Sequence, residues 1–212
     1  MSNKIVPNLA SGSDLALSLI DIGGGTFALA VSNQGCADHN SFAGKFGGYD
    51  AKPRVSFNRP SGNTTQYTAG DVIGTSPASV IEFNGVAISP GQGGVVYGAT
   101  LIDKANQTTK LAAPELWLFS FPPAAVVDNG VFAPTDDELA SSLIGVFPFS
   151  SSYIGKADAG DNGNVVFLCT DRSFAYLCAA GRSSLYGVLV ARNAYTPVSA
   201  EQFTVSIDCI PR

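Results

Sequence analysis

The first residues with the types and spacing for chemistry form a glycine-rich turn near the N-terminus, at positions 21–26 with the sequence DIGGGT. Glycines in such a turn let backbone N–H groups approach a phosphate, while Asp21 could help to hold a metal ion. A nucleotide site of this kind needs a second phosphate loop and a longer chain of alternating strands and helices, and the sequence offers neither. We therefore interpret the segment as a bend before a strand, and we predict no cofactor.

The single histidine, His39, follows Asp38 and precedes Ser41, which are the residue types of a hydrolytic triad. A triad needs an imidazole that reaches both the nucleophile and the orienting acid. Adjacent side chains in an extended chain point in opposite directions, so Asp38 and His39 do not meet this requirement. The chain also lacks the G-x-S-x-G turn that presents a nucleophilic serine. We predict no catalytic residue and no enzyme activity.

A later segment is rich in the oxygen ligands that calcium takes, with Asp158, Asp161, Asn162 and Asn164 placed around two glycines. Their spacing does not match an EF-hand loop, and no glutamate closes the segment. Asp and Asn beside glycine also form turns between strands. We interpret the segment as such a turn and predict no metal site, and whether it binds calcium stays open.

Three consecutive acids, Asp136, Asp137 and Glu138, could form a carboxylate pair for catalysis, but they follow Thr135 at the spacing of a capping box. Acidic residues in the first turn of a helix also complement its dipole. The pattern predicts a helix of one or two turns that ends before Gly145.

The four cysteines match no zinc-binding spacing; they are Cys36, Cys169, Cys178 and Cys209. A tight hairpin turn expected at residues 171–173 would place Cys169 opposite Phe174 and Cys178 opposite Val165. The sulfur atoms of Cys169 and Cys178 would then be too far out of register for a disulfide. We predict buried free thiols.

The composition favours short strands joined by tight turns, because charged residues make up 14% and hydrophobic residues 45% of the 212 positions, with 23 Gly and 12 Pro. The net charge of −5 and the scattered Lys and Arg residues argue against a phosphate-binding surface, so we predict no nucleic-acid partner. No apolar run is long enough to span a membrane, and the N-terminus lacks a secretion signal. We predict no membrane partner and no export.

The order of apolar runs and turn signals predicts a mainly β protein: an antiparallel β-sandwich or jelly roll with an extended N-terminal arm and one short helix. Asn84-Gly85 between apolar runs is a strong hairpin signal. The expected strands cover residues 54–57, 66–68, 79–83, 94–103, 115–121, 145–149, 164–170, 174–179, 184–192 and 202–209.

The strand expected at 115–121 is bulky on both faces, with Leu116 and Leu118 on one and Trp117 and Phe119 on the other. Such a strand is covered on both sides, by the core and by either a loop or a neighbouring subunit.

The chain divides by composition into an extended N-terminal arm with a Gly-rich loop at residues 1–53 and a β-sandwich domain at residues 54–212. Residues 1–20 are expected to end in a first strand, and a short helix over 14–20 is the alternative. A second strand is expected at 27–32.

Three segments together resemble a known family. They are residues 59–74 (RPSGNTTQYTAGDVIG), residues 98–121 with LID at 101–103 and ELWLF at 115–119, and LYGVLVAR at 185–192 followed by AYTP at 194–197. In this order they resemble structural proteins of tailed-bacteriophage virions, some of which are similar to capsid decoration or cement proteins. The resemblance covers residues 54–210.

The resemblance implies a β-sandwich homotrimer on the outside of a phage capsid, with the major capsid protein and copies of itself as partners. It implies synthesis in the host bacterial cytoplasm, and it carries over no catalytic residue. An arm of low charge can wrap a large surface when it becomes ordered on binding. We therefore predict capsid contacts for Lys4, Ile5, Val6, Pro7 and Leu9. A tail or receptor-binding structural protein is the alternative.

Overall fold

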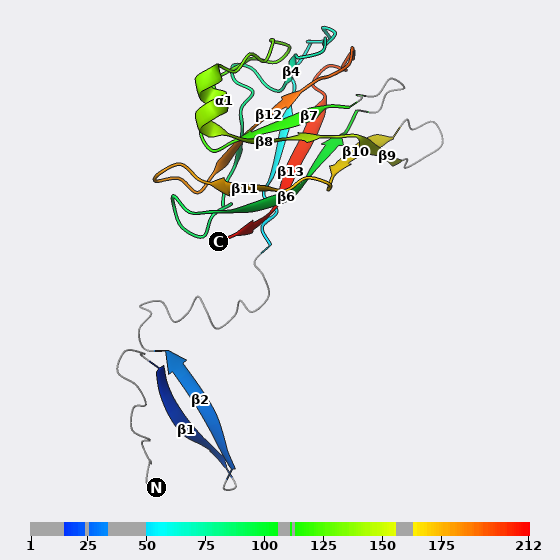
Figure 1. Ribbon diagram of the computed structural model, residues 1–212. Coiled ribbons are helices and arrows are strands. Elements are labelled where there is room, and N and C mark those ends of the chain that lie inside the picture. Colours follow the sequence, from blue (N-terminus) through cyan, green and yellow to red (C-terminus); the bar gives the residue numbers. More distant parts are fainter. Residues whose placement is uncertain (1–14, 24–25, 34–49, 106–110, 112, 156–162) are drawn as a thin grey trace. The chain divides into compact units, whose positions relative to one another are not determined.

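The chain divides into two compact units, Met1–Gly48 and Tyr49–Arg212. The computed structural model describes residues 15–23, 26–33, 50–105, 111, 113–155 and 163–212 (Figure 1). We call Tyr49–Arg212 the body.

The first unit contains a two-stranded antiparallel hairpin of β1 (Leu15–Gly23) and β2 (Thr26–Asn33). The strand expected before residue 20 is confirmed, and the alternative of a helix over 14–20 is wrong. The second expected strand, at 27–32, is also confirmed, since β1 and β2 pair from Leu15 opposite Asn33 to Gly23 opposite Thr26. Within the glycine-rich segment at 21–26, β1 ends at Gly23 and β2 begins at Thr26.

The body is built from two antiparallel sheets and one helix, α1 (Asp136–Ser142). Sheet 1 contains, in spatial order, β3 (Arg54–Asn58), β13 (Gln202–Pro211), β6 (Gly93–Asp103), β10 (Asn164–Cys169) and β9 (Ser151–Gly155), with β11 (Phe174–Leu177) also paired to β6. Sheet 2 contains β4 (Val72–Ile73), β12 (Leu185–Val190), β7 (Glu115–Phe119) and β8 (Leu143–Pro148), with β5 (Ile81–Phe83) also paired to β12.

The main core lies between the two sheets and receives alternate residues from each. Leu101 and Val205 of sheet 1 join Leu116, Leu118 and Leu189 of sheet 2 in one buried cluster. Each of these side chains is fully removed from water, which stabilises the fold by about 2 kcal/mol per leucine. The prediction of a mainly β protein with an antiparallel β-sandwich is confirmed.

A second, smaller cluster covers the outer face of sheet 2. Phe119 and Val188 are buried there, with Trp117 and Phe132 packed against them. The Phe132 ring contacts the Trp117 ring edge-on, with 5.4 Å between the ring centroids. The strand at 115–119 is therefore covered on both faces as predicted, and a segment of the same chain supplies the second cover.

The helix begins with the predicted capping box. The Thr135 hydroxyl oxygen accepts a hydrogen bond from the Glu138 N–H, and the Glu138 carboxylate accepts one from the Thr135 N–H at 2.7 Å. The bonds that the carboxylate accepts, first from the Thr135 N–H and then from the Ala124 N–H and the Thr135 hydroxyl, lower the pKa of Glu138 below its ordinary value. The helix ends at Ser142, before Gly145, as the sequence predicted.

Two predicted hairpins are wrong. The strand before Asn84-Gly85 is β5, which pairs with β12 and not with the next strand along the chain. The segment at 171–173 also does not reverse the direction of the chain. The strands β10 and β11 both run antiparallel to β6 and lie one after the other along the same side of it. Tight turns indicate local backbone conformation, but they do not choose the partner of the following strand.

Several strand bounds also differ from the prediction. Residues 66–68 form an isolated bridge between Tyr67 and Tyr195 instead of a strand. The short strands β4 and β9 were not predicted, because neither shows a clear apolar alternation.

Candidate functional site

The most concentrated polar chemistry in the described residues surrounds Asp128, a buried carboxylate that accepts hydrogen bonds from four residues. Its Oδ2 accepts from Arg59 Nη2 at 2.8 Å and from Asn63 Nδ2 at 3.1 Å. Its Oδ1 accepts from the Tyr67 hydroxyl at 2.5 Å and from the Gly74 N–H at 3.1 Å. The Arg59 and Asp128 side chains are 0% and 1% exposed, so this ion pair is fully enclosed.

A second pair of buried acids consists of Glu201, in the C-terminal segment, and Asp103, at the end of β6. Glu201 accepts hydrogen bonds from the Tyr195 hydroxyl at 2.5 Å and the Val198 N–H at 3.1 Å. Asp103, which is also buried, accepts one from the Ala105 N–H at 2.8 Å. Burial, and then the charge and hydrogen bond of Asp103, raise the pKa of Glu201 to about 8. The pair therefore holds a proton at neutral pH.

Two stacked tyrosines connect these acid groups. The Tyr67 and Tyr195 rings are nearly parallel, with 6.3 Å between their centroids. Burial and Asp128 raise the pKa of Tyr67 far above its ordinary value, so its hydroxyl stays a hydrogen-bond donor. The Arg59 N–H also donates to the Glu201 carbonyl oxygen at 2.9 Å. We call Arg59, Tyr67, Asp103, Asp128, Tyr195 and Glu201 the buried polar network.

The buried polar network joins segments far apart in sequence and has the properties of a structural device. Its charged groups are closed to solvent and are bonded to one another, which fixes the loops that carry them. Removing one partner of such a buried ion pair strongly lowers the free energy of unfolding, because the other charge is left buried without a partner.

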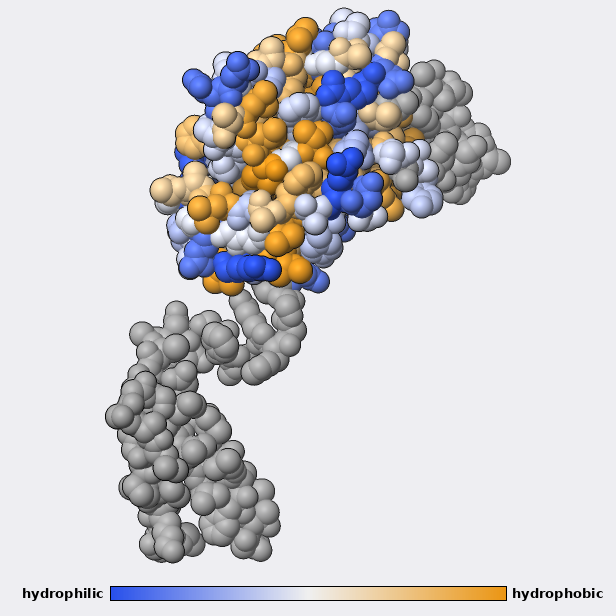
Figure 2. Space-filling model, in the orientation of Figure 1, coloured by the Kyte–Doolittle hydropathy of each residue, from blue (hydrophilic) through white to orange (hydrophobic). Residues whose placement is uncertain are grey.

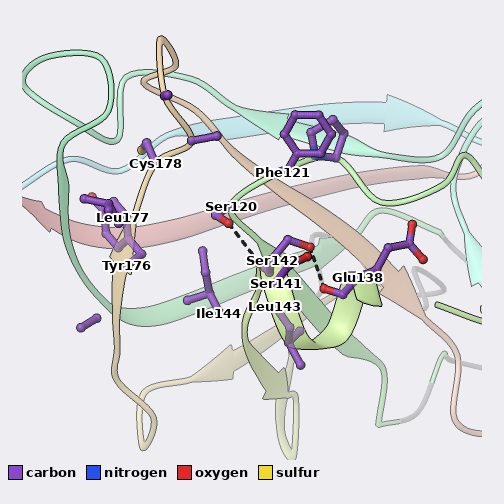
Figure 3. A pocket seen from close by; sticks show the side chains of 14 residues that line it. Ser120, Phe121, Glu138, Ser141, Ser142, Leu143, Ile144, Tyr176, Leu177 and Cys178 are labelled. Atoms are coloured by element: carbon purple, nitrogen blue, oxygen red, sulfur yellow. Dashed lines mark hydrogen bonds between the residues drawn. The ribbon is translucent and has the colours of Figure 1, made fainter. Parts of the chain in front are cut away.

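The described part of the body also has a groove of about 610 Å³ between α1 with the start of β8 and the strand β11 (Figure 3). Phe121 and Leu177 line it and are 52% and 66% exposed. The Phe174 ring lies close behind, because a Cβ at Gly145 would come within 2.6 Å of it.

The polar residues of this groove are already bonded within the protein. The Ser142 hydroxyl donates to the Glu138 carbonyl oxygen at 2.7 Å, and the Ser141 hydroxyl donates to the Asp137 carbonyl oxygen at 2.6 Å. The Glu138 carboxylate accepts from the Thr135 and Ala124 N–H groups. The groove therefore offers an apolar rim rather than free polar groups for a small ligand.

Several residues singled out in the sequence lie outside the described residues. They are Lys4, Ile5, Val6, Pro7, Leu9, Gly24, Gly25, Cys36, Asp38, His39, Ser41, Asp158, Asp161 and Asn162. Asn164 begins β10 and is exposed. The capsid contacts of the N-terminal residues stay a prediction, as does the turn without a metal site around Asp158 and Asp161.

The remaining cysteines agree with the sequence prediction. Cys169, Cys178 and Cys209 are buried free thiols. Burial raises the pKa of the Cys169 and Cys209 thiols to about 11, so neither carries a thiolate at neutral pH.

Within the described ranges, no three His, Cys, Asp or Glu side chains gather in a way that could hold a metal ion. In the same ranges no helix has the length and apolarity to cross a membrane. On the face shown in Figure 2, apolar side chains occupy a broad part of the body, with strongly hydrophilic residues among and around them.

Sequence reasoning did not find the buried polar network. The available signal was the scarcity of charge, because an isolated Arg or Asp in a chain with 14% charged residues is a candidate for a specific partner. The partners themselves are 69 residues apart in the case of Arg59 and Asp128, a separation that no local pattern reports.

Comparison with known proteins places the chain in no family. No family model matches it, and no curated protein sequence matches it. Among solved structures, a chain of a marine algae virus of the order Picornavirales is 11% identical, with 92% of this chain and 99% of that chain covered and a TM-score of 0.16. A chain of infectious bursal disease virus, strain Gx, is 14% identical, with 96% of this chain and 48% of that chain covered and a TM-score of 0.19. At these TM-scores neither match establishes a shared fold, and no argument rests on them.

Proposed function

We propose that the protein is a viral structural protein that binds the outside of a phage capsid and stabilises it. The observation that carries this proposal is the order of the strands. Sheet 1 reads β3-β13-β6-β10 and sheet 2 reads β4-β12-β7-β8, with β5 continuing β4 along β12 and β9 added at an edge. Each sheet thus pairs strands from the beginning, middle and end of the body, as in a jelly roll, an architecture that recurs in viral capsid domains.

Jelly rolls also occur in lectins and in cupins, so the architecture alone does not select the function. The polar groups of the body support a structural role. The groups of the buried polar network bond to one another and hold loops in place, and the serines of the groove donate to backbone carbonyl oxygens. The side chains of the body thus contribute stability and surface, which are the properties that a decoration protein requires.

The proposed partner is the major capsid protein, and the N-terminal unit is the proposed arm. In this proposal Lys4, Ile5, Val6, Pro7 and Leu9 contact the capsid. Several copies of such an arm bind one shell with an avidity that exceeds the affinity of a single arm.

The test is the location and copy number of the protein in purified particles of the virus that encodes it. Quantitative mass spectrometry should give a fixed ratio of this protein to the major capsid protein, and a gold-labelled antibody should bind the outside of the head. Particles without the protein would overturn the proposal.

A tail or receptor-binding protein is the second candidate, and labelling confined to the tail would support it. A receptor binder for sugars needs an open groove rich in aromatic side chains. The described groove presents Phe121 in this role, while the hydroxyl of Tyr176 is bonded to the Val86 carbonyl oxygen. This observation favours the capsid proposal.

A further inference from the structure

The outer face of sheet 1 carries exposed apolar side chains around a centre where the small hydroxyl side chains of Thr204 and Ser206 are buried. Sheet 2 has its outer face covered by the cluster around Phe119 and Phe132, whereas no described segment of the body forms a cluster of that kind over sheet 1. Among the described side chains in strands of the body, four large hydrophobic ones are exposed, and by strand register they alternate with core residues; they are Tyr97, Tyr153, Leu177, which also lines the groove beside α1, and Ile210, with exposed fractions of 38%, 63%, 66% and 40%.

The strand register shows what else this face presents. Tyr153, Val166, Ile102, Thr204 and Ser56 form one continuous row across five strands. In β6, β10 and β13 the neighbours of these residues along the strand are buried in the core, so this row faces outward; they are Leu101, Val165, Phe167, Phe203 and Val205. The row contains no charge.

The next row repeats the pattern, with Leu168, Thr100 and Ser206 in register. Among the described residues, charge on this face comes from Arg54 on the edge strand β3, from Asp208, whose carboxylate is paired with Lys52 at 2.8 Å, and from Lys104, whose ammonium group donates to the Gln202 side-chain oxygen at 2.7 Å. The centre of the face is therefore made of aliphatic, tyrosine and hydroxyl side chains.

The size of this face suits a specific protein interface. The strands β3, β13, β6, β10, β9 and β11 have 5, 10, 11, 6, 5 and 4 residues, and at ~3.3 Å per residue and ~4.8 Å between strands they cover ~650 Å². This area is somewhat below the ~800 Å² that each partner contributes to a standard interface.

We propose that the outer face of sheet 1 is the interface between two copies of this chain, packed face to face about a two-fold axis. Charge depletion at the centre is typical of interfaces between identical subunits. An uncharged sheet face must also be covered from the time of synthesis to avoid aggregation, and a second copy is the partner that is always present then. Identical sheets related by a two-fold axis pack as two aligned layers.

This inference goes beyond the proposed function, because its test needs no virus particle. The full-length chain is measured by light scattering and by sedimentation velocity over a concentration series. We expect a mass of about 44 kDa, twice the 21.9 kDa of one chain.

Two variants place a lysine on the face. Ile102→Lys introduces a charge near the centre, and the symmetry places two such charges in each dimer, so the dissociation constant should rise by about 100-fold. Tyr153→Lys changes a side chain that is 63% exposed and gives a second variant should Ile102→Lys fail to fold by circular dichroism. The control is Val131→Lys, which is 70% exposed and lies outside sheet 1.

A dimer that dissociates in the folded sheet 1 variants and persists in Val131→Lys supports the proposal. A wild-type chain that stays monomeric at every concentration overturns it, including the case in which its own N-terminal unit covers the face. A dimer or a trimer that neither folded variant weakens also overturns it.

Discussion

Replacing Glu201 with Gln removes a buried carboxyl group whose proton depends on folding. Burial and Asp103 raise the pKa of Glu201 from 4.5 to about 8 in the folded protein. Below pH 4.5 the group is protonated in both the folded and the unfolded chain, so it does not affect the free energy of unfolding. Between pH 4.5 and 8 the unfolded chain loses this proton while the folded chain keeps it, and the free energy of unfolding falls as pH rises.

The magnitude follows from the width of this window. Each pH unit inside it lowers the free energy of unfolding by about 1.4 kcal/mol, which sets an upper limit of about 5 kcal/mol between pH 4.5 and 8. We expect a loss of at least about 2 kcal/mol between pH 5.5 and 8. Glu201→Gln is neutral in both states and loses this slope, so it should be more stable than the wild type at pH 8.

The assay is urea unfolding, followed by the fluorescence of the single tryptophan, Trp117, at half-unit steps from pH 5 to pH 9. The difference in unfolding free energy between wild type and Glu201→Gln cancels the titration of groups that do not interact with Glu201, and it reports on Glu201 together with its partner Asp103. The same exchange at the exposed Glu82 controls for removal of one negative charge. Parallel pH profiles for the wild type and Glu201→Gln would refute the assignment of a shared proton to this pair.

Three further predictions concern the fold. Asp128→Ala leaves the Arg59 guanidinium buried without its partner and should lower the free energy of unfolding by about 3–5 kcal/mol in urea, and an effect below about 1 kcal/mol would contradict the enclosed ion pair. Gly93→Ala places a Cβ 1.9 Å from the Tyr176 carbonyl oxygen, so the amides of β11 should exchange hydrogen much faster, and unchanged protection would contradict this pairing. Thr135→Ala removes the helix cap and should cost about 1 kcal/mol in thermal unfolding, and a cost near zero would contradict the cap.

Local patterns predicted the elements whose burial follows from their own sequence. The alternation around Phe203 and Val205 predicted the strand that became β13, and the two bulky faces around Trp117 predicted a strand covered on both sides. The capping box at Thr135 predicted the helix. In each case the sequence signal lies within a few neighbouring residues, although the partners of β7 and β13 are distant in the chain.

Features that depend on distant partners were not predictable in this way. Gly85 has a positive φ of 73°, but Asn84 does not, so the hairpin turn that needs both is not formed, and the segment carries the chain from sheet 2 to sheet 1. Partner choice depends on the whole set of strands competing for β6 and β12. Likewise Arg59 and Glu201 look like surface charges in the sequence, because burial arises only when their segments meet through the Arg59 N–H and the Glu201 carbonyl oxygen.

The most direct test of the central claim is an electron cryo-microscopy reconstruction of intact particles of the virus that encodes this chain. The account predicts ordered density for a β-sandwich on the outer surface of the head, into which the body with sheets 1 and 2 fits. Heads with a bare outer surface, or density for this fold at the tail alone, would contradict the claim that the protein decorates the capsid.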